Sequence, residues 1–223
     1  MDDTRIIHIS SLEILTKAIA FAANKHSNQR RKNKDKSPYI EHPIRVMHLL
    51  SKSGINSLKI LCAAVLHDTV EDTQTTKEEL IKEFGEEIAK IVMEVTDDKS
   101  LPKVERKKQQ IEHAKHTLSY EARQVKLADK LDNLSSIQSD PPTNWSKEEI
   151  EGYVNWCYAV CDNLKVENGY INKKLVKIFQ RDASKFESIT ELNEFTERKL
   201  QEYYNFLEEK EKETEKNKNI FIF

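Results

Sequence analysis

Residues 58–66 read LKILCAAVL, and the chain continues with HDTVED at residues 67–72. The first nine residues are apolar on nearly every side, which is typical of a helix surrounded by other helices. The histidine and the aspartate that follow lie where burial is expected, and a buried polar group without a partner is costly. This stretch therefore predicts a central helix with a polar site, His67 and Asp68, at its end.

Helical periodicity continues on both sides of this stretch. Ile88, Ile91, Val92 and Val95 follow one another at helical spacing, and Gly85 separates them from a preceding helix. The chain has only 4 Gly and 5 Pro, too few for the many turns of a sandwich or barrel. We therefore expect an all-α fold, a compact helical bundle. The other predicted helices cover about residues 12–26, 43–53, 102–117, 120–137, 150–164 and 173–179.

The length of the chain bounds its domain organisation. Its 223 residues, 38% of them hydrophobic, are enough for one sizeable core. We predict one domain over residues 1–180 and a charged C-terminal helical extension over residues 181–223. The apolar residues between 189 and 207 could dock this helix on the domain or on a partner, so homo-oligomerisation through the extension is left open.

Charge and cysteine usage exclude several classes of partner. The 36 Lys and Arg nearly cancel the 38 Asp and Glu, so no global field favours nucleic acid or an anionic membrane. No apolar run approaches the roughly 20 residues that span a bilayer. The cysteines, Cys62, Cys157 and Cys161, have no framework spacing, which predicts reduced thiols. We expect a cytoplasmic protein whose partner is a small molecule.

Four residues far apart in the sequence suit a metal site: His42, His67, Asp68 and Asp129. Two imidazoles and two carboxylates favour a divalent ion such as Mn, Fe, Co or Zn and leave coordination positions open. Taken singly, a histidine before a proline is more often a helix-start residue, and a lone aspartate is usually a surface charge. The four residues together therefore indicate a metal site more strongly than any one of them alone.

Two further acidic residues, Glu71 and Asp72, follow the His67-Asp68 pair by about one turn. If they converge with Asp68 and Asp129, each pair of charges at ~4 Å costs about 1 kcal/mol in water-like surroundings and several in a shielded cleft. A divalent cation removes that penalty. The alternative is that the carboxylates stay apart or become protonated.

These residues lie within segments that resemble a known family. The order of His42, His67-Asp68 and Asp129 resembles the HD superfamily of metal-dependent phosphohydrolases. The surrounding segments look like the hydrolase domain of RelA/SpoT proteins, and most of all like their small single-domain relatives of the metazoan SpoT homologue type. The resemblance covers roughly residues 12–179. The matching segments are RRKNKDKSPYIEHPIRV (30–46), AAVLHDTVEDTQTT (63–76), EVTDDKSLPKVERK (94–107) and VKLADKLDNL (125–134).

The resemblance implies a reaction and a metal. The family removes pyrophosphate from the 3′ position of guanosine tetra- or pentaphosphate, ppGpp or pppGpp, and returns GDP or GTP. It implies one Mn²⁺, with Zn²⁺ or another divalent ion as alternatives. The ligands would be His42, His67, Asp68 and Asp129, and the residues that orient or deprotonate the attacking water would be Glu71 and Asp72.

The resemblance also implies contacts with the nucleotide. Arg31 would stack on the guanine and Lys32 would meet phosphate, although by composition residues 29–36 are an ordinary solvated loop. In the family, a basic residue tends to occur near the position of Glu149. This chain has acidic residues at positions 148 and 149, so one phosphate contact of the family is not predicted for it. The remaining predicted nucleotide contacts are Lys103 and Arg106, which could instead form an ordinary exposed helix face, together with Asn133 and Tyr153.

Two other functions remain open at this point. The same site would serve a phosphatase of the HD superfamily that acts mainly on another phosphorylated nucleotide such as NADPH, because the sequence fixes neither the base nor the ribose position. A non-enzymatic nucleotide-binding module is the third reading. The Glu71-Asp72 pair argues against it, since binding alone does not require groups that transfer protons.

Overall fold

The computed structural model describes residues 10–183 and 188–220, which fold into eleven α-helices with no β-strand among them. The predicted all-α class is confirmed. An isolated bridge between Arg30 and Pro38 closes the basic loop. The helices are α1 (Ser11–Lys25), α2 (Glu41–Lys52), α3 (Leu58–Leu66), α4 (Thr69–Asp72), α5 (Lys77–Phe84), α6 (Glu86–Val95), α7 (Lys103–His116), α8 (Tyr120–Ser139), α9 (Lys147–Leu164), α10 (Gly169–Ala183) and α11 (Ile189–Ile220).

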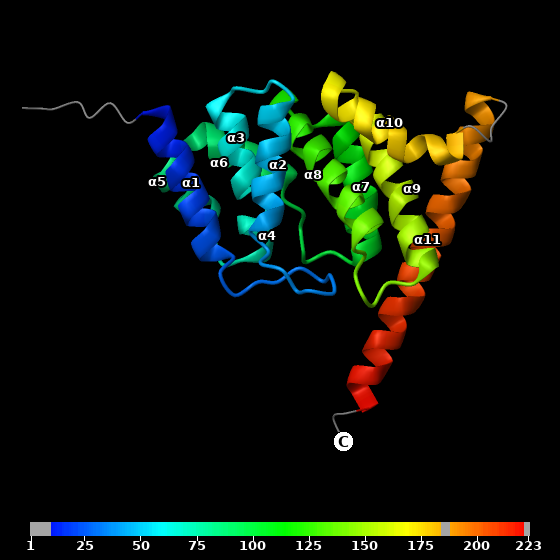
Figure 1. The fold of residues 1–223 in the computed structure, drawn as a ribbon. Helices are drawn as coiled ribbons and strands as arrows, with labels where there is room; N and C mark the ends of the chain where they lie inside the picture. The colour runs from blue at the N-terminus through cyan, green and yellow to red at the C-terminus, as the bar shows by residue number, and fades with distance from the viewer. Residues whose placement is uncertain (1–9, 184–187, 221–223) are drawn as a thin grey trace, which may run out of the picture.

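Helix α3 lies at the centre of the first half of the bundle, as its apolar sequence predicts (Figure 1). It packs against α1, α2, α6 and α8. Residues 62–66 are completely buried, and two of them, Ala63 and Ala64, are small. Small side chains let neighbouring helices approach closely. The end of α3, where His67 begins the polar segment, is therefore held from several sides.

The helix boundaries follow local signals in the sequence. Ser10, Thr76, Ser119 and Ser146 each precede a helix, and each side-chain oxygen accepts a hydrogen bond from the backbone N–H three residues later. Gly85 separates α5 from α6 with a φ of 84°, a conformation that favours glycine. The predicted helices lie where they were expected, with ends that differ by a few residues, whereas the short helix α4 was not predicted.

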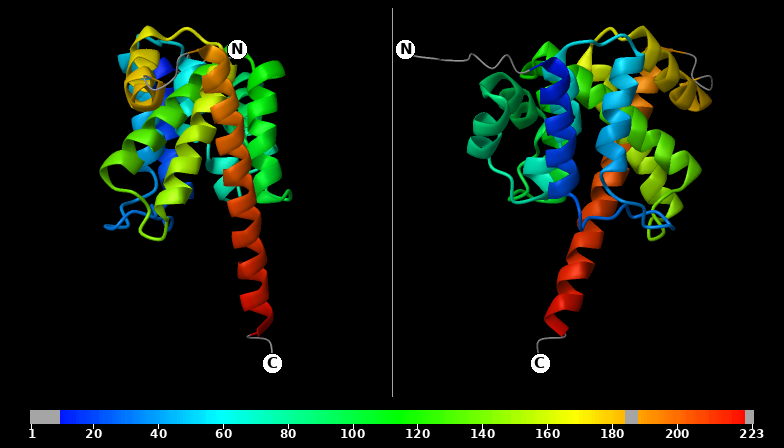
Figure 2. Two further views of the ribbon diagram at one scale, coloured as in Figure 1. Left: turned by 90° about the vertical axis from the view of Figure 1, so that its right-hand side faces the viewer. Right: turned by 60° about the vertical axis from the view of Figure 1, so that its left-hand side comes forward.

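Helices α7, α8 and α9 form the second half of the bundle, and α11 covers its outer side (Figure 2). The C-terminal part of α11 extends beyond the body of the protein (Figure 1). The apolar side chains in the middle of α11, Tyr203, Tyr204 and Leu207, are buried. Tyr203 packs onto Gly152 of α9 so closely that an added Cβ would lie 2.2 Å from the tyrosine ring. The extension therefore docks on its own domain, and self-association through it stays a prediction.

The predicted division after residue 180 falls inside α10, whose backbone continues to residue 183. Residues 184–187, which precede α11, lie outside the described residues. The division into a domain and an extension therefore stays a prediction. Among the helices that the structure describes, none has the length and apolar character that a bilayer crossing requires.

Candidate metal centre and adjoining cavity

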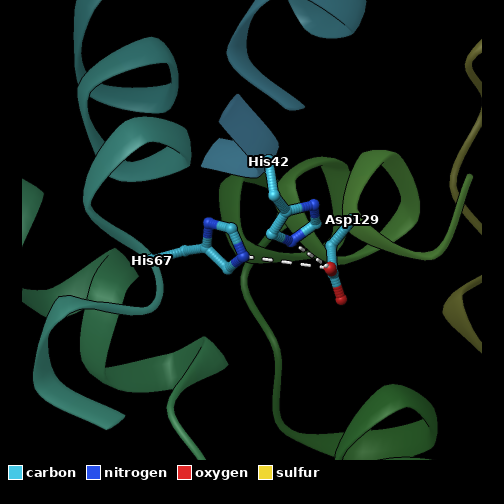
Figure 3. A group of neighbouring side chains, drawn as sticks. All are labelled: His42, His67 and Asp129. Carbon is cyan, nitrogen blue, oxygen red and sulfur yellow. Dashed lines mark ion pairs between the residues drawn. The ribbon is translucent and has the colours of Figure 1, made fainter. Parts of the chain in front are cut away.

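Three helices bring the predicted metal ligands together. His42 lies in the first turn of α2, His67 follows the last residue of α3, and Asp129 lies in the middle of α8. Asp68 precedes the short helix α4. Figure 3 shows the two imidazole rings converging on the carboxylate of Asp129. His42, His67 and Asp129 are buried and offer donor atoms within 4.8 Å of one another.

The four side chains meet through their coordinating atoms. Asp129 Oδ1 lies 3.2 Å from Nε2 of His42 and 3.8 Å from Nε2 of His67. Asp68 Oδ2 lies 3.1 Å from Nε2 of His67 and 3.6 Å from Nε2 of His42. Both imidazoles therefore present the same nitrogen, Nε2, to the two carboxylates.

Groups behind the imidazoles fix the orientation of both rings. Asp132 Oδ2 lies 2.7 Å from Nδ1 of His42 and is itself held by Arg45, whose Nε donates to Oδ1 at 2.8 Å. His67 Nδ1 lies 2.8 Å from the carbonyl oxygen of Ala64. A carboxylate or carbonyl that binds the distal N–H of a histidine is the usual support of a metal ligand. This support directs the Nε2 atom of each imidazole, the atom that would bind a metal ion, toward the two carboxylates.

The electrostatics of the cluster suit a divalent cation. Burial by itself lowers the pKa of His67, but Asp68 and Asp129 outweigh it and raise this pKa to about 9. Burial by itself raises the pKa of Asp129, but Lys130 and the two histidines hold it well below its ordinary value. The carboxylates thus stay ionised and need nearby positive charge. His67 Nε2 is buried and lies 3.1 Å from Asp68 Oδ2, but it makes no well-aligned hydrogen bond among the described residues. A buried imidazole nitrogen between two carboxylates fits a divalent ion.

Glu71 and Asp72 flank this cluster in different surroundings. Burial, with further contributions from Asp97 and Asp68, raises the pKa of Glu71 to about 7. Its Oε2 accepts a hydrogen bond from the backbone N–H of Asp97 at 3.2 Å. Asp72 accepts a hydrogen bond from Gln29 at 3.1 Å and pairs with Lys99. Glu71 is therefore suited to proton transfer near neutral pH.

Two adjoining cavities serve the site. A cavity of about 180 Å³ contains the four predicted ligands and Glu71. A larger one of about 700 Å³ contains Asp72 and the basic loop, and its size suits a small-molecule ligand. Tyr39, Asn133 and Tyr153 line both cavities. A molecule bound in the larger cavity can therefore present a group to the metal cluster.

The structure places the predicted nucleotide contacts in two groups. Arg31 and Lys32 line the larger cavity, where the Arg31 guanidinium lies 5.7 Å from the ring centre of Tyr39 and donates to Asn133 Oδ1 at 3.3 Å. Lys103 instead pairs with Glu149, at 3.6 Å. Arg106, the other predicted contact on α7, has a buried Nε without a hydrogen-bond partner among the described residues, and neither cavity is lined by it.

Several residues of the site were not predicted from the sequence. Asp132 lies three residues after Asp129 on the same face of α8, which was the one available signal. Tyr39 donates a hydrogen bond to Asp68 Oδ2 at 2.7 Å. Lys130 pairs with Asp129 Oδ2 at 3.1 Å, and its Nζ lies 4.5 Å from the ring centre of Trp156. The contacts of Tyr39 with Asp68 and of Lys130 with Trp156 join segments too distant in the sequence for a local pattern to reveal them.

The sequence matches the HD domain family over residues 18–159, a range that contains all four predicted ligands. The chain belongs to the HD domain family. The segments on which the resemblance is based contain the four predicted ligands, and residues 135–153 complete the wall of the larger cavity. The predicted family is therefore confirmed.

Two curated relatives are similar along most of their length. The zebrafish (Danio rerio) protein named guanosine-3′,5′-bis(diphosphate) 3′-pyrophosphohydrolase MESH1 is 48% identical over 174 residues, which cover 78% of this chain and 96% of the relative. The human (Homo sapiens) protein of the same name is 45% identical over 168 residues, which cover 75% of this chain and 93% of the relative. These similarities establish this member of the HD domain family as a hydrolase.

A solved structure agrees with this assignment. A metazoan orthologue of SpoT, described as hydrolysing ppGpp and acting in starvation responses, superposes with a TM-score of 0.73 at 44% identity. The match covers 75% of this chain and 94% of the solved one. The HD family match ends at residue 159, before α11 begins.

Proposed function

We propose that this protein hydrolyses guanosine 3′,5′-bis(diphosphate), ppGpp, and its pentaphosphate form to GDP or GTP and pyrophosphate, with one Mn²⁺ ion. The observation that carries the proposal is the buried His42, His67 and Asp129 cluster, whose cavity shares walls with a larger cavity lined by basic residues. The relatives named for this activity support it. The free cysteines are consistent with a reducing cytoplasm.

The ion would be held by His42, His67, Asp68 and Asp129. When bound, it would supply Lewis acidity and make water at the site easier to deprotonate. The chain contributes the orientation of the ligands through Asp132, whose carboxylate fixes the ring of His42. The two ligand carboxylates are already ionised in the folded chain.

Glu71 and Asp72 would handle the protons of the reaction. The water oxygen forms a bond to the 3′ phosphorus, and the bond from that phosphorus to the ribose 3′ oxygen breaks. Pyrophosphate leaves with the water oxygen, and the 3′ oxygen takes up a proton. Glu71, with a pKa of about 7 and a place in the metal cavity, is suited to accept the proton of water. Asp72 lines the nucleotide cavity, where it would meet the leaving 3′ oxygen.

Nucleotide binding would use the larger cavity. The guanidinium of Arg31 faces an aromatic ring on one side, Tyr39, and can stack on a base with its other side. Lys32 supplies positive charge for phosphate, and Asn133 and Tyr153 lie between the two cavities. Lys103 is proposed as a further phosphate contact. To bind phosphate, its ammonium group would have to leave the carboxylate of Glu149. Arg106, on the same helix, is proposed in the same role.

The test is a release assay with purified protein. With Mn²⁺, we expect pyrophosphate to be released from ppGpp, and phosphate from NADPH to be released with a much lower specificity constant. A parallel series with Zn²⁺ identifies the preferred ion. Absence of pyrophosphate release with every divalent ion would contradict the proposal, and a higher specificity constant for NADPH would assign the site to another nucleotide.

A further inference from the structure

Glu149 on α9 is a buried carboxylate that lysines surround. Its side chain is 1% exposed. Lys210 of α11 lies 2.5 Å from Oε2, and Lys103 of α7 lies 3.6 Å from Oε1. A buried carboxylate that loses its partners is strongly destabilising. Lys210 makes the close contact, whereas Lys103 is held more loosely.

This cluster lies one helical turn from Tyr153, a residue of the nucleotide-cavity wall, although neither Glu149 nor Lys103 lines the cavity itself. Glu149 lies one turn before Tyr153 on α9, and Lys103 lies one turn before Lys107 on α7, so each pair shares a helix face. Lys107 Nζ lies 4.8 Å from the ring centre of Tyr153, which lines the cavity. The two helices therefore face each other here, and Glu149 and Lys103 lie one turn behind the Tyr153 and Lys107 contact.

Lys32 connects the cluster to the cavity by charge. Burial lowers the pKa of Lys103; Glu149 opposes this effect, and the ammonium groups of Lys210 and Lys32 add to it. Lys32 thus acts on the ammonium of Lys103 while lining the larger cavity. Lys103 therefore pairs with a carboxylate, Glu149, and also feels a weaker repulsion from Lys32, which lines the cavity.

Packing contacts and a hydrogen bond hold helix α11 beside Glu149 and Lys103. Tyr203 occupies the space above Gly152, one turn beyond Glu149 on α9. Leu207, one turn further along α11, is 1% exposed. Glu211 accepts a hydrogen bond from the backbone N–H of Lys103 at 3.2 Å, in the first turn of α7. The docked helix therefore touches both partners of the cluster, Glu149 through Lys210 and Lys103 through Glu211.

We propose that Lys210 is a positioning residue for the substrate: it neutralises Glu149, and thereby leaves Lys103 free to bind a phosphate group of the nucleotide beside Lys32. This inference rests on the proposed function. Without Lys210, Glu149 would retain Lys103 as its only close cation and would repel a phosphate at the same place. The C-terminal helix is then part of the substrate site and not merely a packing element.

The test compares Lys210→Met with wild type in the full-length protein. We expect KM for ppGpp to rise about threefold to tenfold while kcat changes little, because Glu149 is then no longer neutralised by Lys210 and retains Lys103. Lys210→Arg should restore KM. Lys212→Met, which removes the same charge from an exposed position of α11, should leave KM unchanged.

The decisive comparison repeats the Lys210→Met substitution in a protein that carries Glu149→Gln. A neutral amide needs no cation, so Lys210→Met should then change KM less than twofold. An equal rise of KM in both backgrounds, or a loss of kcat with unchanged KM, would overturn the role of Lys210. An active wild type with an unaffected Lys210→Met variant contradicts this inference alone, whereas an inactive wild type contradicts the proposed function and this inference with it.

Discussion

The cluster around His67 and the cluster around Glu149 both bury carboxylates in the same helical bundle, but different groups neutralise them. At the first, Lys130 pairs with one of two aspartates, and both aspartates face two imidazole nitrogens across a small cavity. At the second, two lysines from separate helices meet the single carboxylate of Glu149. The first cluster is suited to a cation from solution, and the second is neutralised by the chain itself.

This difference indicates which kind of change each cluster tolerates. A site built for an ion depends on the count and orientation of its ligands, so removing one ligand removes the function. A carboxylate neutralised by lysines depends on the helices that carry them, so it responds to changes in helix docking. The following variants separate these two behaviours.

The largest effect is expected from Asp68→Ala, which removes a carboxylate that lies within 3.6 Å of both imidazole Nε2 atoms. We expect bound metal to fall and ppGpp turnover to decrease by roughly 10³-fold or more. Elemental analysis and pyrophosphate release measure the two quantities, and circular dichroism checks that the fold is retained. Unchanged turnover with full metal content would remove Asp68 from the ligand set.

Glu71→Gln should decrease kcat/KM by about 10²- to 10⁴-fold, the usual contribution of general base catalysis. In the wild type, kcat/KM should rise with pH as Glu71 loses its proton, at or below pH 7, because its pKa is raised to about 7 in the metal-free chain and a bound cation lowers it. The variant should lose this limb of the pH profile. A profile that keeps the limb in the variant would assign the titration to another group.

The same variant should stabilise the metal-free protein at alkaline pH. Folding raises the pKa of Glu71 from 4.5 to about 7, so the unfolded chain loses this proton first and the free energy of unfolding falls as pH rises between these values. Glutamine carries no charge and avoids this cost. We expect thermal unfolding in EDTA to show a gain that is absent near pH 4 and reaches up to about 3 kcal/mol above pH 7.

Asp132→Asn tests the support behind the metal ligands. The carboxylate holds Nδ1 of His42 and is held by Arg45, so its neutralisation should weaken metal affinity by about 10- to 100-fold. Excess metal should restore most of the activity. Glu121→Gln, also on α8 but paired with Lys59 at the surface, is the matched control. Equal metal affinity in both variants would show that Asp132 does not tune the ligand.

The smallest effect is expected from Gly152→Ala, which addresses the second cluster through helix docking. The added Cβ would lie 2.2 Å from the ring of Tyr203, so α11 must shift and Lys210 must move away from Glu149. We expect KM to rise about threefold with little change in kcat, and unfolding to be easier by about 1–3 kcal/mol.

Gly169→Ala is the control for this substitution, because no atom lies within 4 Å of its added Cβ. It should leave both KM and stability close to wild type. If Gly152→Ala destabilises the protein without changing KM, the docking of α11 is independent of the nucleotide site.

The predictable part of the site is the part that local sequence encodes. His67 and Asp68 were recognised because they end an apolar helix, and Glu71 and Asp72 because they follow within one turn. Asp132 was missed, although it shares a face of α8 with Asp129, since an acidic residue on a helix is usually solvated. Lys103 was predicted as a phosphate contact, and its pairing with Glu149 had no local signal.

The helical class, the order of the main helices and the polar end of α3 could all be predicted from the amino-acid sequence. Apolar periodicity and capping residues act over a few positions, so they can be recognised without coordinates. The support of His42 by Asp132, 90 residues away, and the pairing of Lys210 with Glu149, 61 residues away, became visible in the folded chain. Such pairs depend on how helix faces pack, and packing of side chains from distant segments leaves no periodic pattern in the chain.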